Sequence, residues 1–156
     1  MARHSALDTL IELTRTALDD AARLLASERR TQLQIQQQLQ ILQQYRLEYG
    51  QRMQEAMYQG IDPASLLNYR AFLGSLDSAI ERATRSMHSQ QQKVDNSQRV
   101  WQEQRRKLNS YDTLVERRQQ TALLQASRRE QRVSDELSAR LRQNTDTAAP
   151  SPDRSA

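Results

Sequence analysis

The chain contains no cysteine, and it has only three glycines and three prolines among 156 residues. The lack of thiols excludes disulfides, thiolate chemistry and cysteine-based metal sites. Aromatic residues make up only 4% of the chain, and the mean hydropathy is −0.90. This leaves too little apolar side chain for a thick globular core. The composition instead suits a thin apolar seam between long helices.

Long apolar runs are also absent. The first twenty residues are polar and acidic within a few turns and lack the continuous apolar region of a signal peptide. No stretch approaches the ~18 apolar residues that a transmembrane helix requires. We therefore expect a soluble, cytoplasmic protein without direct membrane insertion.

The few helix breakers are concentrated at one place. Before Pro150 the only proline is Pro63, and Gly60 lies just ahead of it. Gly60 suits the C-terminal end of a helix, Asp62 the N-cap of the next helix, and Pro63 its first turn. The sequence predicts one helix over about 5–58, a turn over about 59–62 and a second helix over about 63–142. These form a single coiled-coil domain over 1–142, followed by a disordered tail over 143–156.

Apolar residues in the first segment recur in steps of three and four. They are Leu7, Ile11, Leu18, Ala21, Leu25, Ile35, Leu39, Leu42, Tyr49, Met53 and Ala56, with polar interruptions at Thr14, Glu28, Gln32 and Arg46. Ser5 and Asp8 have the spacing of a capping box. A periodic run of this length without internal caps is typical of a coiled coil.

The second segment has a strict seven-residue repeat. Its apolar row is Leu66, Leu73, Ile80, Met87, Val94, Trp101, Leu108, Val115 and Ala122. Its companion row, Tyr69, Leu76, Ala83, Gln90, Ser97, Gln104, Tyr111, Arg118 and Gln125, becomes mostly polar beyond Gln90. The fold class is therefore all-α, a long antiparallel two-helix coiled-coil hairpin. We expect its seam to be tight near the turn and looser away from it.

The short turn sets the register. Residue i of the first helix should face roughly residue 121 minus i of the second, so Tyr49 lies near Phe72 and Leu42 near Ala79. Residues past about Arg118 would have no partner helix. We interpret the two helix glycines, Gly50 and Gly74, as sites of close approach or bending.

The chain offers little for catalysis. His4 and His88 lie far apart in the hairpin, and Asp19 and Asp20 are adjacent and point to different helix faces. No phosphate-binding loop, nucleophile elbow or HExxH motif occurs. We expect neither an enzyme nor a bound cofactor or metal.

Positive charge is concentrated in the second helix. Residues 1–58 carry seven arginines and seven acids, whereas residues 59–142 carry fifteen basic residues and ten acids. Arginine pairs recur at Arg105 and Arg106, Arg117 and Arg118, and Arg128 and Arg129. Interleaved acids argue against nucleic acid as a partner. An acidic protein surface fits this distribution better.

Aromatic residues gather around the turn: Tyr45, Tyr49, Tyr58, Tyr69 and Phe72 are five of the seven in the chain. Gln38, Leu42, Tyr45 and Tyr49 follow one stripe of the first helix, and Phe72, Leu76, Ala79 and Ala83 follow a stripe of the second. Leu42, Tyr49, Leu76 and Ala83 fall on seam positions, whereas Tyr45, Phe72 and Ala79 lie beside the seam. A two-helix hairpin cannot bury both stripes fully, so we expect an exposed apolar patch that binds a partner.

Several segments resemble the FliJ family of the flagellar type III export apparatus. The segments are "LDTLIELTRTALDDAARLLASERR", "QLQILQQYRLEY", "KVDNSQRVWQEQRRKLNSYDTLVERRQQTALL" and above all "GIDPASLLNYRAFLGSLDSAIERA". Together they cover about residues 4–142. The turn segment is the most specific of them, since heptads alone are shared by many unrelated coiled coils.

This resemblance implies a stalk-like coiled coil at the cytoplasmic face of the membrane, at the base of the flagellum. It would promote ring assembly of the hexameric export ATPase and link it to the membrane export-gate protein FlhA and to export chaperones. Carried over by position, the gate-binding residues are Gln38, Leu42, Tyr45, Tyr49, Phe72, Leu76 and Ala79. Ala83 departs from the family pattern. The end with the two termini would dock to the ATPase, and the six paired arginines are our candidates for that contact.

Three alternatives remain open at this point. A virulence type III secretion stalk shares the hairpin, although such relatives generally lack a turn segment like "NYRAFL". A holdase-type chaperone would use the aromatic patch to bind many unfolded clients. A passive structural coiled coil would have no exposed patch.

Overall fold

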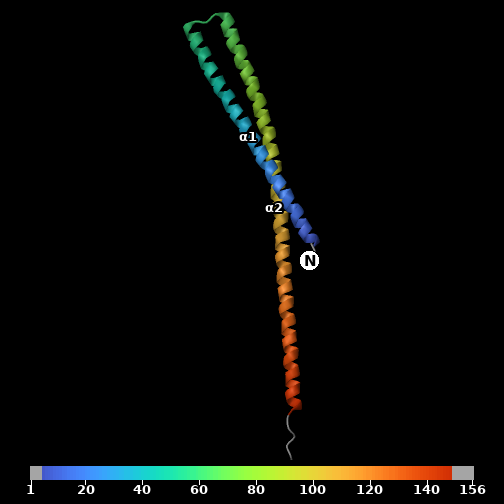
Figure 1. The fold of residues 1–156 in the computed structure, drawn as a ribbon. Helices are drawn as coiled ribbons and strands as arrows, with labels where there is room; N and C mark the ends of the chain where they lie inside the picture. Colours follow the sequence, from blue (N-terminus) through green and yellow to red (C-terminus); the bar gives the residue numbers. More distant parts are fainter. Residues whose placement is uncertain (1–4, 149–156) are drawn as a thin grey trace, which may run out of the picture. The chain divides into compact units, whose positions relative to one another are not determined.

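The computed structural model describes residues 5–148, which form two α-helices joined by a short turn. Helix α1 spans Ala6–Gln59 and helix α2 spans Pro63–Thr147, with no strand in this part of the chain. The chain divides after Leu108 into two units, a helical hairpin and the later part of α2. Within the hairpin unit the two helices run antiparallel beside each other (Figure 1). The predicted all-α hairpin is therefore confirmed.

The capping box at the start of α1 is formed as predicted. The Asp8 backbone N–H donates to the Ser5 hydroxyl at 3.3 Å, and the Ser5 N–H donates to the Asp8 carboxylate at 3.1 Å. Two amides without helical partners are thereby satisfied, which fixes where the helix begins.

The turn uses the breakers in their predicted order. Gly60 has φ 92° and ψ 121°, and its N–H donates to the Met57 carbonyl at 3.4 Å. Its φ is positive as expected, although its ψ lies outside the left-handed helical region. Helix α2 then begins at Pro63, and the Asp62 carboxylate accepts from the Ser65 hydroxyl at 3.1 Å.

The end of α2 differs from the prediction. The predicted disordered tail begins at Gln143, yet the helix continues to Thr147. This segment contains neither glycine nor proline, and the hydroxyls of Thr145 and Thr147 donate back to carbonyls one turn earlier. The next breaker is Pro150, which disfavours helix in the residue before it. The rest of the predicted tail, 149–156, lies outside the described residues, as does His4.

The seven-residue repeat predicts the seam correctly. In the hairpin unit, every position of both α2 rows from Leu66 to Leu108 is buried or half-buried. The predicted apolar positions of α1 are buried or half-buried as well. In the later unit, Arg118, Ala122 and Gln125 are exposed, and so is every residue from Glu116 to Ala148.

Contacts between the arms show the register. The ring centroids of Tyr49 and Phe72 lie 4.3 Å apart, as predicted for two residues whose numbers add up to 121. Arg46 Nε donates to Asp77 at 2.7 Å, and this pair departs from the predicted register by only two residues. Leu42 and Ala79 line one surface hollow together. The register predicted from the turn is therefore confirmed.

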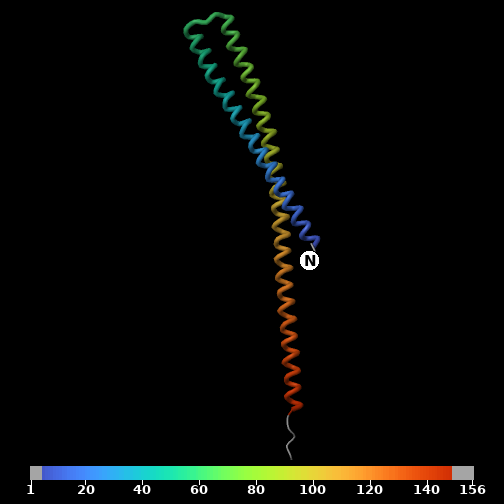
Figure 2. The backbone as a smooth tube through the Cα atoms, in the orientation of Figure 1, coloured from blue at the N-terminus to red at the C-terminus, as the bar shows by residue number. Residues whose placement is uncertain are grey.

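The expected gradient of packing along the seam holds only in part, because Leu73 and Leu76 near the turn are buried but residues farther from it are buried as well. The ribbons diverge toward the turn (Figure 2), where seam residues such as Leu66, Tyr69 and Met53 are only half-buried. The buried residues of α1, each 7–8% exposed, lie in its first half: Leu7, Ile11, Thr14, Ala21 and Leu25. The facing stretch of α2 contains Gln90, Val94 and Ser97, which are also buried at 5–7% exposure. The small side chains of Ala21 and Ser97 suit close packing there, whereas nearer the turn the larger rings of Tyr49 and Phe72 contact each other between the arms.

A buried amide fixes the polar part of this seam. The Gln90 side-chain amide donates to the Glu28 carbonyl at 2.9 Å and also to the Glu28 carboxylate. Two positions that interrupt the apolar pattern thus satisfy each other. A polar pair at a seam position specifies register, because sliding the helices leaves it unpaired.

Neither helix glycine marks a close approach, which is one of the two roles predicted for them. A Cβ added at Gly74 would meet nothing within 4 Å, and one at Gly50 would meet only the Arg46 guanidinium at 3.9 Å. Both positions have ordinary room for a side chain.

Substitution by alanine should change the free energy of unfolding in opposite directions at the turn glycine, Gly60, and at the helix glycine, Gly74. Gly60→Ala should destabilise by about 1–2 kcal/mol, because an L-residue is strained at positive φ. Gly74→Ala should stabilise by roughly 0.5–1 kcal/mol, since it lowers the entropy cost of the helix. Urea unfolding followed by circular dichroism measures both. Destabilisation by Gly74→Ala would indicate a contact at Gly74 that the structure does not have.

Loss of the buried amide should be costly. Gln90→Ala removes both hydrogen bonds to Glu28, and we expect about 1–3 kcal/mol lower free energy of unfolding. Gln92→Ala is the matched control, because Gln92 is exposed on the same helix turn. Equal losses in the two variants would contradict the pairing of Gln90 with Glu28.

Candidate functional site

The predicted gate-binding residues lie together on one flank of the hairpin unit near the turn. We call this surface, formed by Gln38, Leu42, Tyr45, Tyr49, Phe72, Leu76 and Ala79, the aromatic flank. Tyr45 is 50% exposed and Phe72 is 42% exposed. Leu42, Tyr49 and Ala79 are half-buried. Large rings are therefore presented to solvent beside the seam.

Leu76 differs from the other members, since only 7% of it is exposed. It packs in the seam beneath the flank and is not available for direct contact. Tyr58 also departs from the predicted aromatic cluster. It is 95% exposed and belongs to neither stripe.

The two arms meet at a stack of side chains. The Tyr49 and Phe72 rings are tilted by 42° at 4.3 Å, and the Arg52 guanidinium lies 5.2 Å from the centre of the Tyr49 ring. Tilted ring pairs and a cation over a ring are both favourable arrangements. The three side chains hold one another in place and give this part of the flank a defined shape.

Two shallow hollows lie along the aromatic flank. The turn-side hollow is lined by Tyr49, Arg52, Ser65, Asn68, Tyr69 and Phe72. The mid-arm hollow is lined by Ile35, Gln38, Leu42, Ala79, Arg82, Ala83 and Ser86. Tyr45 lies between them along α1.

The other flank is joined by polar side chains. Arg46, which follows Tyr45 and so points about 100° away from it, is paired with Asp77 at 2.7 Å. The hydrogen bond that Arg46 donates to Asp77 and the negative charge of Asp77 raise the pKa of Arg46, which stays charged. Gln32 and Gln91 are hydrogen-bonded as well. The two flanks are therefore chemically different, and the aromatic one has the open apolar surface.

Sequence reasoning missed the hollows and their arginines. Arg52 and Arg82 stand alone in the sequence, whereas the arginine pairs drew attention. Their positions carry a signal, however. Arg52 follows Gln38, a flank residue, by fourteen residues, and Arg82 follows Asn68, which lines the turn-side hollow, by fourteen.

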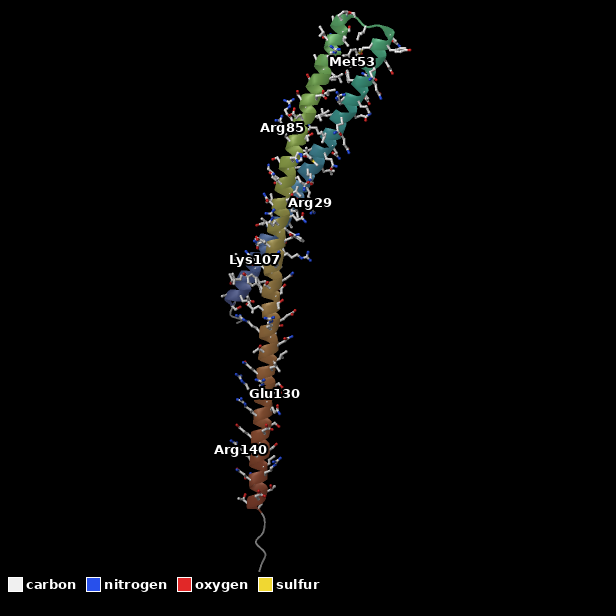
Figure 3. All side chains as sticks on the ribbon, turned by 180° about the vertical axis from the view of Figure 1, so that it is seen from behind. Arg29, Met53, Arg85, Lys107, Glu130 and Arg140 are labelled. Atoms are coloured by element: carbon white, nitrogen blue, oxygen red, sulfur yellow. The ribbon has the colours of Figure 1, made fainter. Side chains whose placement is uncertain are left out.

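The paired arginines are all exposed. Arg105 lies over the Trp101 ring at 5.2 Å in the hairpin unit. Arg117, Arg118, Arg128 and Arg129 belong to the later unit, where side chains project on all sides of α2 around Glu130 and Arg140 (Figure 3). The same segment exposes large apolar residues, including Leu123, Val133, Leu137 and Leu141. It presents both charge and apolar surface.

Within residues 5–148, no cluster of three acidic or histidine side chains could hold a metal ion. None of the helices searched over this range is apolar enough over a sufficient length to cross a bilayer.

Stability measurements should separate the seam from the flank. Leu76→Ala should lower the free energy of unfolding by about 2–5 kcal/mol, as expected for a buried leucine. Tyr45→Ala should change it by no more than about 0.5–1 kcal/mol, because the ring is half exposed. Thermal unfolding of both variants measures the difference. Large destabilisation by Tyr45→Ala would make Tyr45 part of the seam.

Comparisons with known proteins agree with this arrangement. The model of the family "Flagellar FliJ protein" matches residues 3–146. The chain is 37% identical over 140 residues to the flagellar FliJ protein of Salmonella typhi, and 36% identical over 140 residues to that of Escherichia coli strain K12. Each of these matches covers 90% of this chain and 95% of the relative.

A solved structure from Chlamydia trachomatis, described as a candidate YscO homologue, is similar in fold. It matches with a TM-score of 0.64 over 96% of this chain and all of the other, at 15% sequence identity. This likeness concerns the fold alone. The sequence matches extend over nearly the whole length and confirm the resemblance: the chain belongs to the FliJ family and is a component of flagellar protein export.

Proposed function

We propose that this chain acts as a stalk-like coiled coil without catalytic chemistry of its own. It promotes assembly of the hexameric export ATPase ring and links that ATPase to the membrane export-gate protein FlhA and to export chaperones. Its place of action is the cytoplasmic face of the membrane at the base of the flagellum.

One observation carries the gate-binding part of the proposal. Tyr45 and Phe72 are exposed on the flank that is not joined by Arg46 and Asp77. Exposed aromatic rings grouped on one surface mark a partner site, because burying them on binding recovers the cost of their hydration. The stacked Tyr49 below them gives the surface a fixed shape, which reduces the entropy lost on binding.

Charge supports the ATPase part of the proposal. The paired arginines are exposed, and residues 59–142 carry five more basic than acidic residues. Such a surface accelerates and orients encounter with an acidic partner. The exposed leucines of the later unit, Leu123, Leu137 and Leu141, offer apolar area to the same partner.

Gate binding should depend on the aromatic flank. Tyr45→Ala should weaken binding to the cytoplasmic part of the gate protein at least tenfold, because it removes a ring from the centre of the surface. Tyr58→Ala is the matched control, since that ring is more exposed but lies off the flank. Titration calorimetry measures both. Equal weakening by the two substitutions would contradict a specific site.

ATP hydrolysis tests the stalk role. Titrating the chain into the cognate export ATPase should stimulate hydrolysis and saturate well below one chain per ATPase subunit, because one stalk serves a hexameric ring. Replacing Arg117, Arg118, Arg128 and Arg129 together by glutamine should raise the concentration of this chain that is needed for half-maximal stimulation of the ATPase.

Absence of both stimulation and co-elution would remove the stalk role. Binding of many unfolded proteins in its place would then favour a holdase-type chaperone.

A further inference from the structure

The two hollows of the aromatic flank are built from equivalent positions. Adding fourteen to Ser65, Asn68, Tyr69 and Phe72 of the turn-side hollow gives Ala79, Arg82, Ala83 and Ser86 of the mid-arm hollow. On α1, subtracting fourteen from Tyr49 and Arg52 gives Ile35 and Gln38. The hollows therefore repeat after two heptads, about 21 Å along the hairpin at 1.5 Å per residue.

Tyr45 stands midway between the hollows. It is seven residues after Gln38 and seven before Arg52, and half of its surface is exposed. The flank thus offers three contact points in line, each one heptad from the next: a hollow, an exposed ring and a second hollow.

We propose that the aromatic flank receives an amphipathic α-helix of its partner, which lies along the seam as a third helix. Apolar side chains of that helix at positions i and i+14 enter the two hollows, and the side chain at i+7 packs on Tyr45. This inference rests on the proposed function and specifies what kind of segment the flank binds.

The backbone chemistry of the flank favours a helix over an extended segment. The arms are helices whose amides and carbonyls are bonded internally, so the flank has no strand edge with which an extended chain could pair. Backbone groups of an extended segment would lose water here without gaining partners. A helix satisfies its own backbone and brings only side chains to the surface.

Charge adds a second requirement for the partner helix. Each hollow has one arginine in its lining, Arg52 or Arg82, and neither lining contains a carboxylate. Acidic residues next to the two apolar anchors would therefore complement the surface. The proposed occupant is an acidic amphipathic helix with anchors fourteen residues apart.

Filling the hollows tests whether they are occupied. Asn68→Trp and Ala79→Trp should each weaken binding of the gate protein's cytoplasmic part at least tenfold, because the new ring takes the place of an anchor. Ser78→Trp is the matched control, as Ser78 is exposed next to Ala79 but lines neither hollow. Circular dichroism checks that all three variants remain helical. Full binding by both hollow variants would overturn the proposal.

Photo-cross-linking distinguishes a helix from an extended segment. Benzoylphenylalanine is placed at Ile41 in one variant and at Glu55 in another, and the cross-linked residues of the gate protein are found by mass spectrometry. These exposed positions follow Gln38 and Arg52 by three residues, are fourteen residues apart and line neither hollow, so the probe does not displace an anchor. If the partner segment is a helix, the two cross-linked sites lie about fourteen residues apart in it, since the partner helix and α1 both rise about 1.5 Å per residue. An extended segment gives sites about six apart, at about 3.3 Å per residue.

The outcomes separate the two claims. Sites about six residues apart, or sites in unrelated segments, overturn the helix while leaving gate binding intact. If the unmodified chain does not bind the gate protein, the proposed gate-binding function fails, and this inference fails with it. Cross-links to a second copy of the chain would overturn both by showing that the flank is a self-association surface.

Discussion

The seven-residue spacing of seam side chains along α2 is the constraint on which the rest of the hairpin depends. A composition this polar buries few residues, so the seam must be continuous to hold two long helices together. Continuity in turn fixes which side of each helix faces outward. Because Tyr49 meets Phe72 in this register, Tyr45 is placed beside the seam and Arg46 on the side of Asp77. If one helix shifted its seam positions by a single residue, the side chains facing the partner would change by a rotation of about 100°, and these contacts would be lost.

The structure combines a polar and an apolar way of closing a narrow seam. Away from the turn, small side chains and the Gln90 amide allow close packing and specify the pairing. Near the turn, the Tyr49 and Phe72 rings contact each other between the arms, and two hollows lie on one flank. The second arrangement gains less from burial within the chain and keeps apolar surface available for another protein. In the stretch near the turn, buried Leu73 and Leu76 therefore stabilise the hairpin, while the rings beside them remain available for binding.

The sequence predicts much of this because the governing signals are local or periodic. The capping box, the single break at Gly60 to Pro63 and the heptads from Leu66 to Leu108 each follow from short spacings, and the turn then sets the register. The degree of burial along the seam cannot be predicted from such spacings. Sequence polarity suggested that Gln90 and Ser97 loosen the seam, yet size and a specific partner at Glu28 outweigh polarity. The hollows were missed because they arise from spaces between side chains of both arms. The end of α2 was placed too early because polarity was weighed more heavily than the lack of a breaker before Pro150.

Hydroxyl-radical footprinting of the chain, alone and with the cytoplasmic part of the gate protein, tests most directly whether the register creates a binding flank. The chain itself supplies the probes, since Tyr45, Phe72 and Tyr58 are all exposed when it is alone. We expect Tyr45 and Phe72 to lose reactivity together on binding while Tyr58 keeps it. Protection of Tyr58 with continued reactivity of Tyr45 and Phe72 would contradict the central claim, because binding would then use a surface that the seam does not organise.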